Sequence, residues 1–361
     1  MARWDKDKAR AWWADQPWIC GFNFLPSTAV NFIEMWHPDS FDAATIEKEL
    51  GWAAELGFNA LRVNLHYLVW KHDRAGLIRR LDWLMGVAEG LGLRTVPCLF
   101  DDCGFGGFEP AYAPQPDPVP GVHNSRAVAC PGRAALLEGA ERAGWEAYVR
   151  DILRRFGRDP RVLFWDLYNE PGNRMVFEAT GSRLYEPDFT QASRDLMLAA
   201  FDWCRDEAPD QPATVGAWTT PPPGSTDAPY QTEIDQLALA HSDIVTFHAY
   251  WDSAHVRRFI DHLSEQDRPM ICTEWMARPV GSRIADQLDL FQQAKVGCFQ
   301  WGLVRGRTQT HLPWPADLVA AHGGTADRSV WFHDLLDESG RAYDATETAK
   351  LRQALSPGQT A

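Results

Sequence analysis

The sequence is poor in the features that mark several common classes of protein. It has no apolar run long enough for a signal-peptide core or a membrane span, including in its first segment, "MARWDKDKARAWWADQPW". Its seven cysteines are scattered, with no CxxC pair, so no disulfide framework is indicated. We therefore expect a cytoplasmic protein with reduced thiols and no membrane partner, unless a leader peptide has been removed.

Basic residues are also scarce. Lys and Arg number 35 against 49 Asp and Glu, which gives a net charge of −14. A nucleic-acid partner is not expected, because binding a phosphate backbone requires a basic surface. No G-x-G-x-x-G motif follows the first expected strand, which argues against a dinucleotide, and no cofactor is expected.

The residues that are abundant indicate a soluble globular protein. Of the 361 residues, 45% are hydrophobic and 23% are charged. This length suits two ordinary domains or one large α/β barrel. The 17 tryptophans are unusual. Indole rings fill protein cores, but their flat faces also pack on the apolar C–H faces of sugar rings.

Short apolar runs alternate with longer stretches of helical periodicity. This alternation predicts an α/β fold, a (β/α)8 TIM barrel with long βα loops, as one catalytic domain over 1–361; a doubly wound open sheet is the alternative. Glycines at 57 and 92, and similarly at 157 and 297, are expected in left-handed caps between helix and strand. Strands are predicted at 18–24, 60–65, 94–100, 162–169, 213–218, 244–250, 269–275 and 296–304, and helices near 43–56, 75–91, 133–156, 190–207, 231–240, 254–265, 283–295 and 343–355.

Three connections after predicted strands are long and rich in Pro, Gly and aromatic residues: 103–132, 171–189 and 305–341. In a barrel, the βα loops form the active-site face. These three loops are therefore predicted to build a substrate-binding wall.

Two predicted strands end in glutamate. Glu170 follows the apolar run in "VLFWDLYNEPGN", and Glu274 ends the seventh strand in "PMICTEWMARP". A single such residue is usually a solvated turn residue. A pair on strands four and seven can meet in one cavity, and cleavage of a glycosidic bond uses such a pair as acid and as nucleophile or base.

These motifs resemble those of the clan A glycoside hydrolases, most closely glycoside hydrolase family five. "WDLYNEPG" resembles their N-E-P signature, and "TEW" matches the position of their nucleophile. Three further positions match the family: His248 and Tyr250 in "FHAYW" match its H-x-Y after strand six, Arg62 in "LRVNL" its strand-two arginine, and Trp301 in "FQWGL" its strand-eight tryptophan. The resemblance therefore covers residues 18–304.

The resemblance implies a retaining β-glycosidase. Glu170 would be the acid/base and Glu274 the nucleophile, and Asn169 would bond the 2-hydroxyl of the sugar. Because Glu170 must carry a proton beside the charged Glu274, we expect its pKa to be raised.

The other matched residues would surround this pair. Arg62 and Tyr250 would contact Glu274, and His248 would contact Glu170 or the substrate. Trp301 would form the floor under the sugar that is cleaved off; filling the core is the alternative for Trp301, and a barrel-lining ion pair is the alternative for Arg62.

One departure from the family concerns the end of strand three. Many members carry a histidine there, whereas this chain reads "CLFDDCGFGGFEP", with Asp101 and Asp102. Two carboxylates can grip the hydroxyls of a terminal sugar, or they can cap a turn. We predict substrate contacts for both, and also for His66 and His123.

The prolines of the loop after strand three stiffen it, so it can form a wall without a large ordering cost on binding. This favours an exo-acting enzyme on a β-linked oligosaccharide or glycoside. The alternative is an endo-acting β-glycanase of the xylanase, cellulase or mannanase type. A metal-dependent barrel hydrolase using His66, Asp101, Asp102 and Cys103, and a non-catalytic sugar-binding protein, are more remote alternatives.

Overall fold

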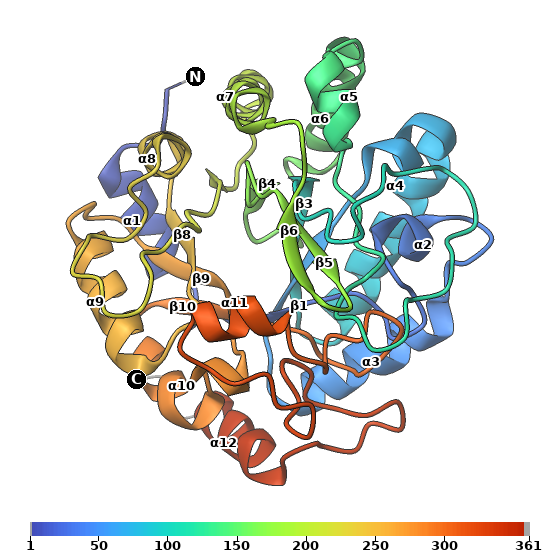
Figure 1. The fold of residues 1–361 in the computed structure, drawn as a ribbon. Helices are drawn as coiled ribbons and strands as arrows, with labels where there is room; N and C mark the ends of the chain where they lie inside the picture. The colour runs from blue at the N-terminus through green and yellow to red at the C-terminus, as the bar shows by residue number, and fades with distance from the viewer. Residues whose placement is uncertain (1, 357–361) are drawn as a thin grey trace.

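Eight parallel strands surround a common axis in the computed structural model, which describes residues 2–356 (Figure 1). Their order around the sheet is β7-β4-β3-β2-β1-β10-β9-β8. The ring is closed where Ala217, just beyond β7, bridges Phe247 of β8 in parallel. The predicted (β/α)8 barrel is confirmed. The strands are β1 (Cys20–Asn23), β2 (Ala60–Asn64), β3 (Arg94–Asp101), β4 (Trp165–Asn169), β7 (Ala213–Thr214), β8 (Val245–His248), β9 (Met270–Trp275) and β10 (Gly297–Trp301).

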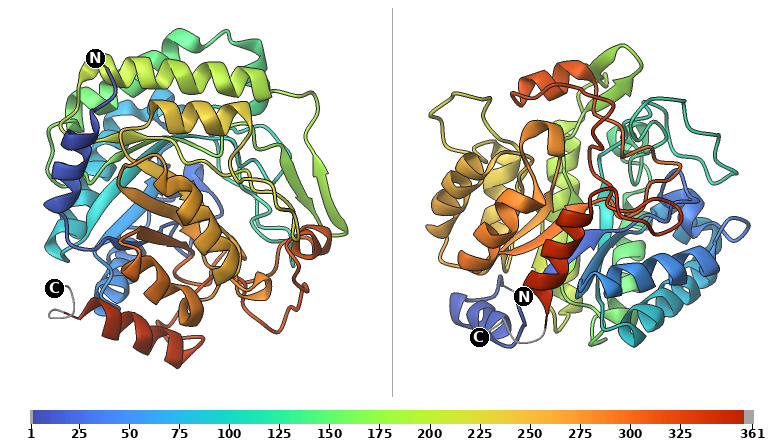
Figure 2. Two further views of the ribbon diagram at one scale, coloured as in Figure 1. Left: turned by 90° about the vertical axis from the view of Figure 1, so that its left-hand side faces the viewer. Right: turned by 90° about the horizontal axis from the view of Figure 1, so that it is seen from below.

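Helices cover the outside of the barrel (Figures 1 and 2). In the part of the chain that the structure describes, no helix combines the length and the apolar character needed to cross a membrane. The helices are α1 (Lys6–Ala14), α2 (Phe32–Trp36), α3 (Ala43–Glu55), α4 (Tyr67–Gly90), α5 (Arg133–Glu138), α6 (Arg142–Phe156), α7 (Thr190–Glu207), α8 (Glu233–His241), α9 (Ser253–Ser264), α10 (Ile284–Gln293), α11 (Ala316–Ala321) and α12 (Ala345–Leu355), with a short 3-10 turn, η1 (Arg278–Val280).

Several local predictions differ from the structure. The helix expected over 133–156 is two helices, because Gly139 adopts φ 65° and ends α5. Gly57 and Gly92 have the expected positive φ. Gly157 has φ −67° and Gly297 begins strand β10 without a positive φ, so the left-handed caps predicted at these two positions are wrong. Helices α1, α2 and α11 and a β-hairpin within 171–189 were not predicted. That 1–361 is one domain stays a prediction.

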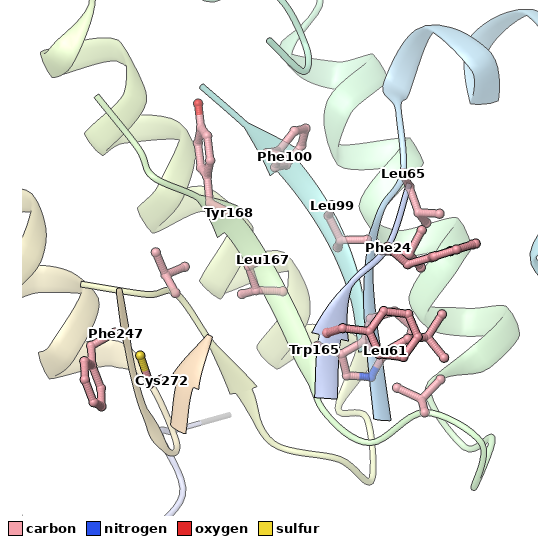
Figure 3. Packing of buried hydrophobic residues seen from close by; sticks show 14 of the residues in the cluster. Phe24, Leu61, Leu65, Leu99, Phe100, Trp165, Leu167, Tyr168, Phe247 and Cys272 are labelled. Carbon is pink, nitrogen blue, oxygen red and sulfur yellow. The ribbon is translucent and has the colours of Figure 1, made fainter. Parts of the chain in front are cut away.

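Alternation along the strands sorts residues between two cores. In β2, Ala60 belongs to a cluster inside the barrel, whereas Leu61 and Val63 belong to the larger cluster between strands and helices. Figure 3 shows part of that larger cluster. Trp12 and Trp13 of α1 pack on the inner cluster. The polar inward positions that remain lie toward the carboxyl ends of the strands, where the long loops are.

Two of these long loops meet across the mouth of the barrel. The loop after β4 forms a hairpin of β5 (Met175–Glu178) and β6 (Gly181–Leu184), and the loop after β10 contains α11. They lie side by side in front of the strands in Figure 1 and at one edge of the left view of Figure 2. The backbone N–H of Ser182 donates to Asp317 at 3.2 Å and its hydroxyl at 2.5 Å. We call residues 175–184 and 314–321 the mouth bridge.

Candidate active site

Glu170 lies where β4 turns into its loop. Its φ of 43° is in the left-handed region, which is uncommon for a residue other than glycine and costs backbone energy. Pro171 and Gly172 follow, and the backbone N–H of Asn173 donates to the carbonyl of Glu170 at 3.0 Å, which closes a tight turn. Since Glu170 lines the central cavity, this turn directs its carboxylate inward from the strand end.

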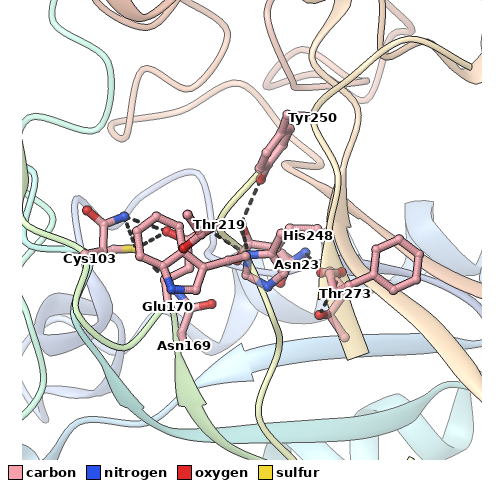
Figure 4. Close-up of polar contacts among 12 residues, drawn as sticks. Asn23, Cys103, Asn169, Glu170, Thr219, His248, Tyr250 and Thr273 are labelled. Carbon is pink, nitrogen blue, oxygen red and sulfur yellow. Dashed lines mark hydrogen bonds and ion pairs between the residues drawn. The ribbon is translucent and has the colours of Figure 1, made fainter. Parts of the chain in front are cut away.

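Glu274 reaches the same cavity from β9, and His248 of β8 lies within reach of both carboxylates. Figure 4 shows Glu170, His248 and Tyr250 together at this site. The imidazole Nδ1 is 2.7 Å from Glu170 Oε1 and 3.7 Å from Glu274 Oε2. One oxygen of each glutamate and a ring nitrogen of His248 all lie within 4.8 Å of one another. The two glutamates that the sequence singled out therefore form a close pair.

Arg62 of β2 organises the floor of the cavity. Its guanidinium donates to Glu274 Oε1 at 3.0 Å, to Asn169 Oδ1 at 2.7 Å and to Asn23 Oδ1 at 2.8 Å, and it pairs with Asp166 at 2.8 Å. Burial opposes its charge, but Asp166 and the other carboxylates outweigh burial, so the pKa of Arg62 is raised. Arg62 therefore keeps its positive charge beside Glu274.

Tyr250 completes the surroundings of Glu274, since its hydroxyl donates to Glu274 Oε2 at 2.7 Å. Both oxygens of Glu274 thus accept hydrogen bonds from opposite sides. Fixed donors of this kind aim a carboxylate in one direction, which an attacking nucleophile requires.

Two residues that were not predicted hold Glu170. Asn173 Nδ2 donates to Glu170 Oε2 at 2.6 Å, and Cys103 Sγ donates to the same oxygen at 3.1 Å. Asn173 stands three residues after Glu170 in "NEPGN", a spacing that suits a side chain folding back over a tight turn. Cys103 comes from another strand end, so the local sequence carries no signal for this contact.

The pKa of Glu170 differs from the expected direction. Burial would raise it, but hydrogen bonds from His248, Cys103 and Asn173 favour the carboxylate and lower the pKa. Burial and the charge of Glu170 raise the pKa of Glu274 against the opposing effect of His248. Burial disfavours the imidazolium of His248, but Glu274 and Glu170 outweigh burial and raise its pKa. These directions favour a carboxylate on Glu170 and a protonated ring on His248, the two groups joined by the 2.7 Å hydrogen bond.

The structure brings most of the predicted site residues together around a cavity of about 270 Å³. Asp101 lies at its base and accepts from Asn169 Nδ2 at 2.9 Å and from Asn64 Nδ2 at 2.8 Å. Trp301 is half-buried in its wall. The predicted residues that line the cavity are Arg62, Asp101, Asn169, Glu170, His248, Tyr250, Glu274 and Trp301.

Three predicted substrate contacts are not at the cavity. His66 caps α4, accepting from the backbone N–H of Leu68, and its Nε2 is 3.2 Å from the carbonyl of Ala129. His123 is buried with its Nδ1 2.7 Å from the carbonyl of Leu312. Asp102 faces away from the cavity because successive residues at the end of β3 point to opposite sides. These three predictions are corrected to structural roles.

We predict that Asp102→Ala destabilises the fold. The carboxylate accepts from Tyr168 Oη at 2.8 Å, Gly172 N at 2.7 Å and Ser193 Oγ at 2.5 Å, and each buried donor left without a partner costs about 1–3 kcal/mol. Urea denaturation should show a lower free energy of unfolding. A variant as stable as the wild type, with activity lost instead, would restore the substrate-binding role for Asp102.

The metal alternative does not fit the geometry of the four residues considered for it, because His66 and Asp102 have their own protein partners away from the cavity. Among the described residues, the one group whose ligand atoms converge is Glu170, His248 and Glu274. These groups already bond to Arg62, Tyr250 and Asn173, donors that a bound cation would have to displace or oppose.

Several solved structures that share this fold are glycoside hydrolases. One is a GH5_18 protein from Streptomyces cattleya in complex with GlcNAc, at 16% sequence identity and a TM-score of 0.57, covering 94% of this chain and 82% of that one. Another is the endo-beta-1,4-mannanase from Thermotoga petrophila, at 12% identity and a TM-score of 0.58, covering 95% and 77%. No protein-family model and no curated protein matches the sequence.

A third structure is the exo-beta-1,4-mannosidase Op5Man5 from Opitutaceae bacterium strain TAV5, at 16% identity and a TM-score of 0.59. The match covers 94% of this chain but 60% of that protein, so this chain spans less than two thirds of its length. The resemblance to glycoside hydrolase family five is thereby confirmed at the level of the fold.

Proposed function

We propose that this protein is a retaining β-glycoside hydrolase, with Glu274 as nucleophile and Glu170 as acid/base. The observation that carries the proposal is the close pair of buried glutamates at the ends of β4 and β9. Retaining enzymes place their carboxyl groups about 5–5.5 Å apart, whereas inverting enzymes need about 6.5–9.5 Å to admit a water. An approach of carboxylate oxygens to within 4.8 Å supports the retaining geometry.

The reaction then proceeds in two displacements. In the first, the carboxylate of Glu274 attacks the anomeric carbon, the bond from that carbon to the leaving oxygen breaks, and the leaving oxygen takes a proton from Glu170. In the second, water attacks the anomeric carbon and gives its proton to Glu170, and the bond to Glu274 breaks. The sugar leaves with its original configuration.

The surrounding residues have separate roles in these steps. Arg62 and Tyr250 hold Glu274 ionised and aimed, and Asn169, fixed by Arg62 and Asp101, is placed to bond the 2-hydroxyl of the sugar. Trp301 offers an indole face to the sugar ring. The hydrogen bond between His248 and Glu170 provides a route for the proton that Glu170 needs when the substrate binds.

The mouth bridge supports an exo-acting enzyme. It joins the loops of β4 and β10, which lie on opposite sides of the barrel, through Ser182 and Asp317. An endo-acting enzyme needs an open cleft through which a chain runs past both ends of the site. Since this bridge crosses the mouth, the end of a chain or a small glycoside fits the cavity better than the middle of a glycan.

The test is a panel of 2,4-dinitrophenyl β-glycosides of glucose, mannose, xylose and galactose, with NMR of the first-formed sugar anomer. We expect hydrolysis of at least one glycoside and a β-anomer as first product. An α-anomer would exclude retention, and failure on all four sugars would contradict the proposal. A spread of mid-length products from a long β-glycan would favour the endo-acting alternative.

The pH profile of kcat/KM should be a bell. As the pH falls through the raised pKa of Glu274, the nucleophile is protonated and activity is lost. As the pH rises through the raised pKa of His248, the proton shared with Glu170 is lost. We expect the acid limb above the usual carboxyl range and the basic limb above the usual imidazole range, measured on an aryl glycoside. An optimum above about pH 8 would require a different acid.

A further inference from the structure

The cavity changes character with height above its floor. The acidic and basic residues that line it, apart from histidine, are Arg62, Asp101, Glu170 and Glu274, and all four belong to the hydrogen-bonded floor at the strand ends. Above the floor, six side chains from three loops form one continuous surface. We call them the apolar wall: Phe105, Ala127, Met175, Phe177, Trp314 and Leu318.

The apolar wall adjoins Glu170. Cys103, whose thiol touches Glu170 Oε2, belongs to the same hydrophobic cluster. The rings of Phe105 and Phe177 are stacked, with centroids 4.2 Å apart and planes at 4°, and the backbone N–H of Phe177 donates to the carbonyl of Phe105 at 2.9 Å. The wall therefore begins beside the proposed acid and continues to the mouth bridge.

Several polar side chains of the upper cavity form hydrogen bonds within the protein. Asn31 Nδ2 donates to Gln115 and to the carbonyl of Arg126, and Thr220 Oγ1 accepts from Trp251. Thr219 bonds to Asp235, and the ring of His322 bonds to the carbonyl of Leu318. The hydroxyls of a second sugar would have to compete with these internal hydrogen bonds, and a polar group buried without a partner is costly.

We infer that the leaving group of the substrate is apolar, an aryl or long alkyl aglycone, rather than another sugar. The inference rests on the proposed function, because the acid of a retaining enzyme lies beside the leaving group, and here that acid is Glu170. An aryl or alkyl aglycone needs no hydrogen-bonding partners. It gains free energy by removing its own surface and that of Phe105 and Phe177 from water.

Inhibition by alkyl 1-thio-β-glycosides tests this inference without requiring their turnover. The sugar is the one that the dinitrophenyl panel identifies, and Ki is measured for the methyl and octyl thioglycosides, below the micelle concentration, against the dinitrophenyl substrate. Each buried methylene is worth a factor of about four. If half of the added methylenes are buried, Ki should fall about 100-fold from methyl to octyl.

A matched pair of leucine and phenylalanine variants locates the effect. Phe177→Ala should raise Ki for the octyl compound about tenfold, so the fall in Ki from methyl to octyl should shrink from about 100-fold to about tenfold. Leu91→Ala, 36% exposed in the turn between α4 and β3 and so at the opposite end of the barrel from the cavity, should leave this fall unchanged, and thermal unfolding checks that both variants fold.

Equal Ki values for methyl and octyl, or a thio-linked disaccharide that inhibits better than the octyl compound, would overturn the inference while leaving the proposed function intact. Inactivity on every dinitrophenyl glycoside would instead reject the proposed function.

Discussion

Glu274→Ala should abolish turnover of every glycoside, by a factor of about 10⁴ or more in kcat. The variant removes the carboxylate that Arg62 and Tyr250 hold at the floor of the cavity. No leaving group, however good, replaces a nucleophile. The loss should therefore be as large on 2,4-dinitrophenyl glycosides as on unactivated substrates.

A 2-deoxy-2-fluoro dinitrophenyl glycoside tests this prediction directly. The fluorine slows both steps, and the good leaving group restores the first one, so a glycosyl-enzyme should accumulate. Mass spectrometry should find the adduct on the peptide that contains Glu274 in the wild type and no adduct in Glu274→Ala. Glu265→Ala, on an exposed loop, serves as the control and should retain activity. An adduct on a different residue would reassign the nucleophile.

Glu170→Ala should separate substrates by their leaving groups. Phenyl glycosides need the proton and should lose about 10²–10⁴-fold in kcat/KM, whereas dinitrophenyl glycosides should still form the glycosyl-enzyme because their leaving group departs without a proton. Deglycosylation should become slow, since no base activates water. Azide needs no base, so it should restore turnover and yield a β-glycosyl azide.

The comparison of the two glutamate variants is the sharpest test of their roles. Stopped-flow measurement of dinitrophenolate release should show a rapid burst for Glu170→Ala and none for Glu274→Ala. If Glu170→Ala loses the dinitrophenyl substrate as completely as Glu274→Ala, or azide fails to restore turnover, Glu170 is not the acid/base. The structural role of Asn173 and Cys103 around Glu170 would then need another explanation.

Local patterns in the sequence predict the barrel and most of its site. Apolar runs and helical stretches that end at a glycine are short-range patterns, so the eight strands and helix α7 could be located from the sequence. The sequence also predicted which residues lie at the strand ends. In a parallel barrel, carboxyl ends of strands share one face, so Arg62, Glu170 and Glu274 had to lie near one another once the strand order was known.

The tertiary structure decided which strand-end residues face the cavity. Asp101 and Asp102 are neighbours of the same type, yet Asp101 lines the cavity and Asp102 bonds to Tyr168, Gly172 and Ser193 outside it. The sequence does not distinguish the two residues. Which of them points into the barrel depends on the register of β3, because successive side chains of a strand point to opposite faces. The positions of His66 and His123 were decided in the same way, by loop carbonyls that only folding brings to them.

Long-range contacts decided the chemistry around Glu170. Cys103 reaches it from the loop after β3 and His248 from β8, and their hydrogen bonds reverse the pKa shift expected from the nearby negative charge alone. The mouth bridge likewise joins segments 135 residues apart. The sequence by itself determined the class of fold and the pair of glutamates, because strand periodicity and strand-end position are local properties. The closure of the mouth and the protonation of the site depend on distances between loops, which only the folded chain establishes.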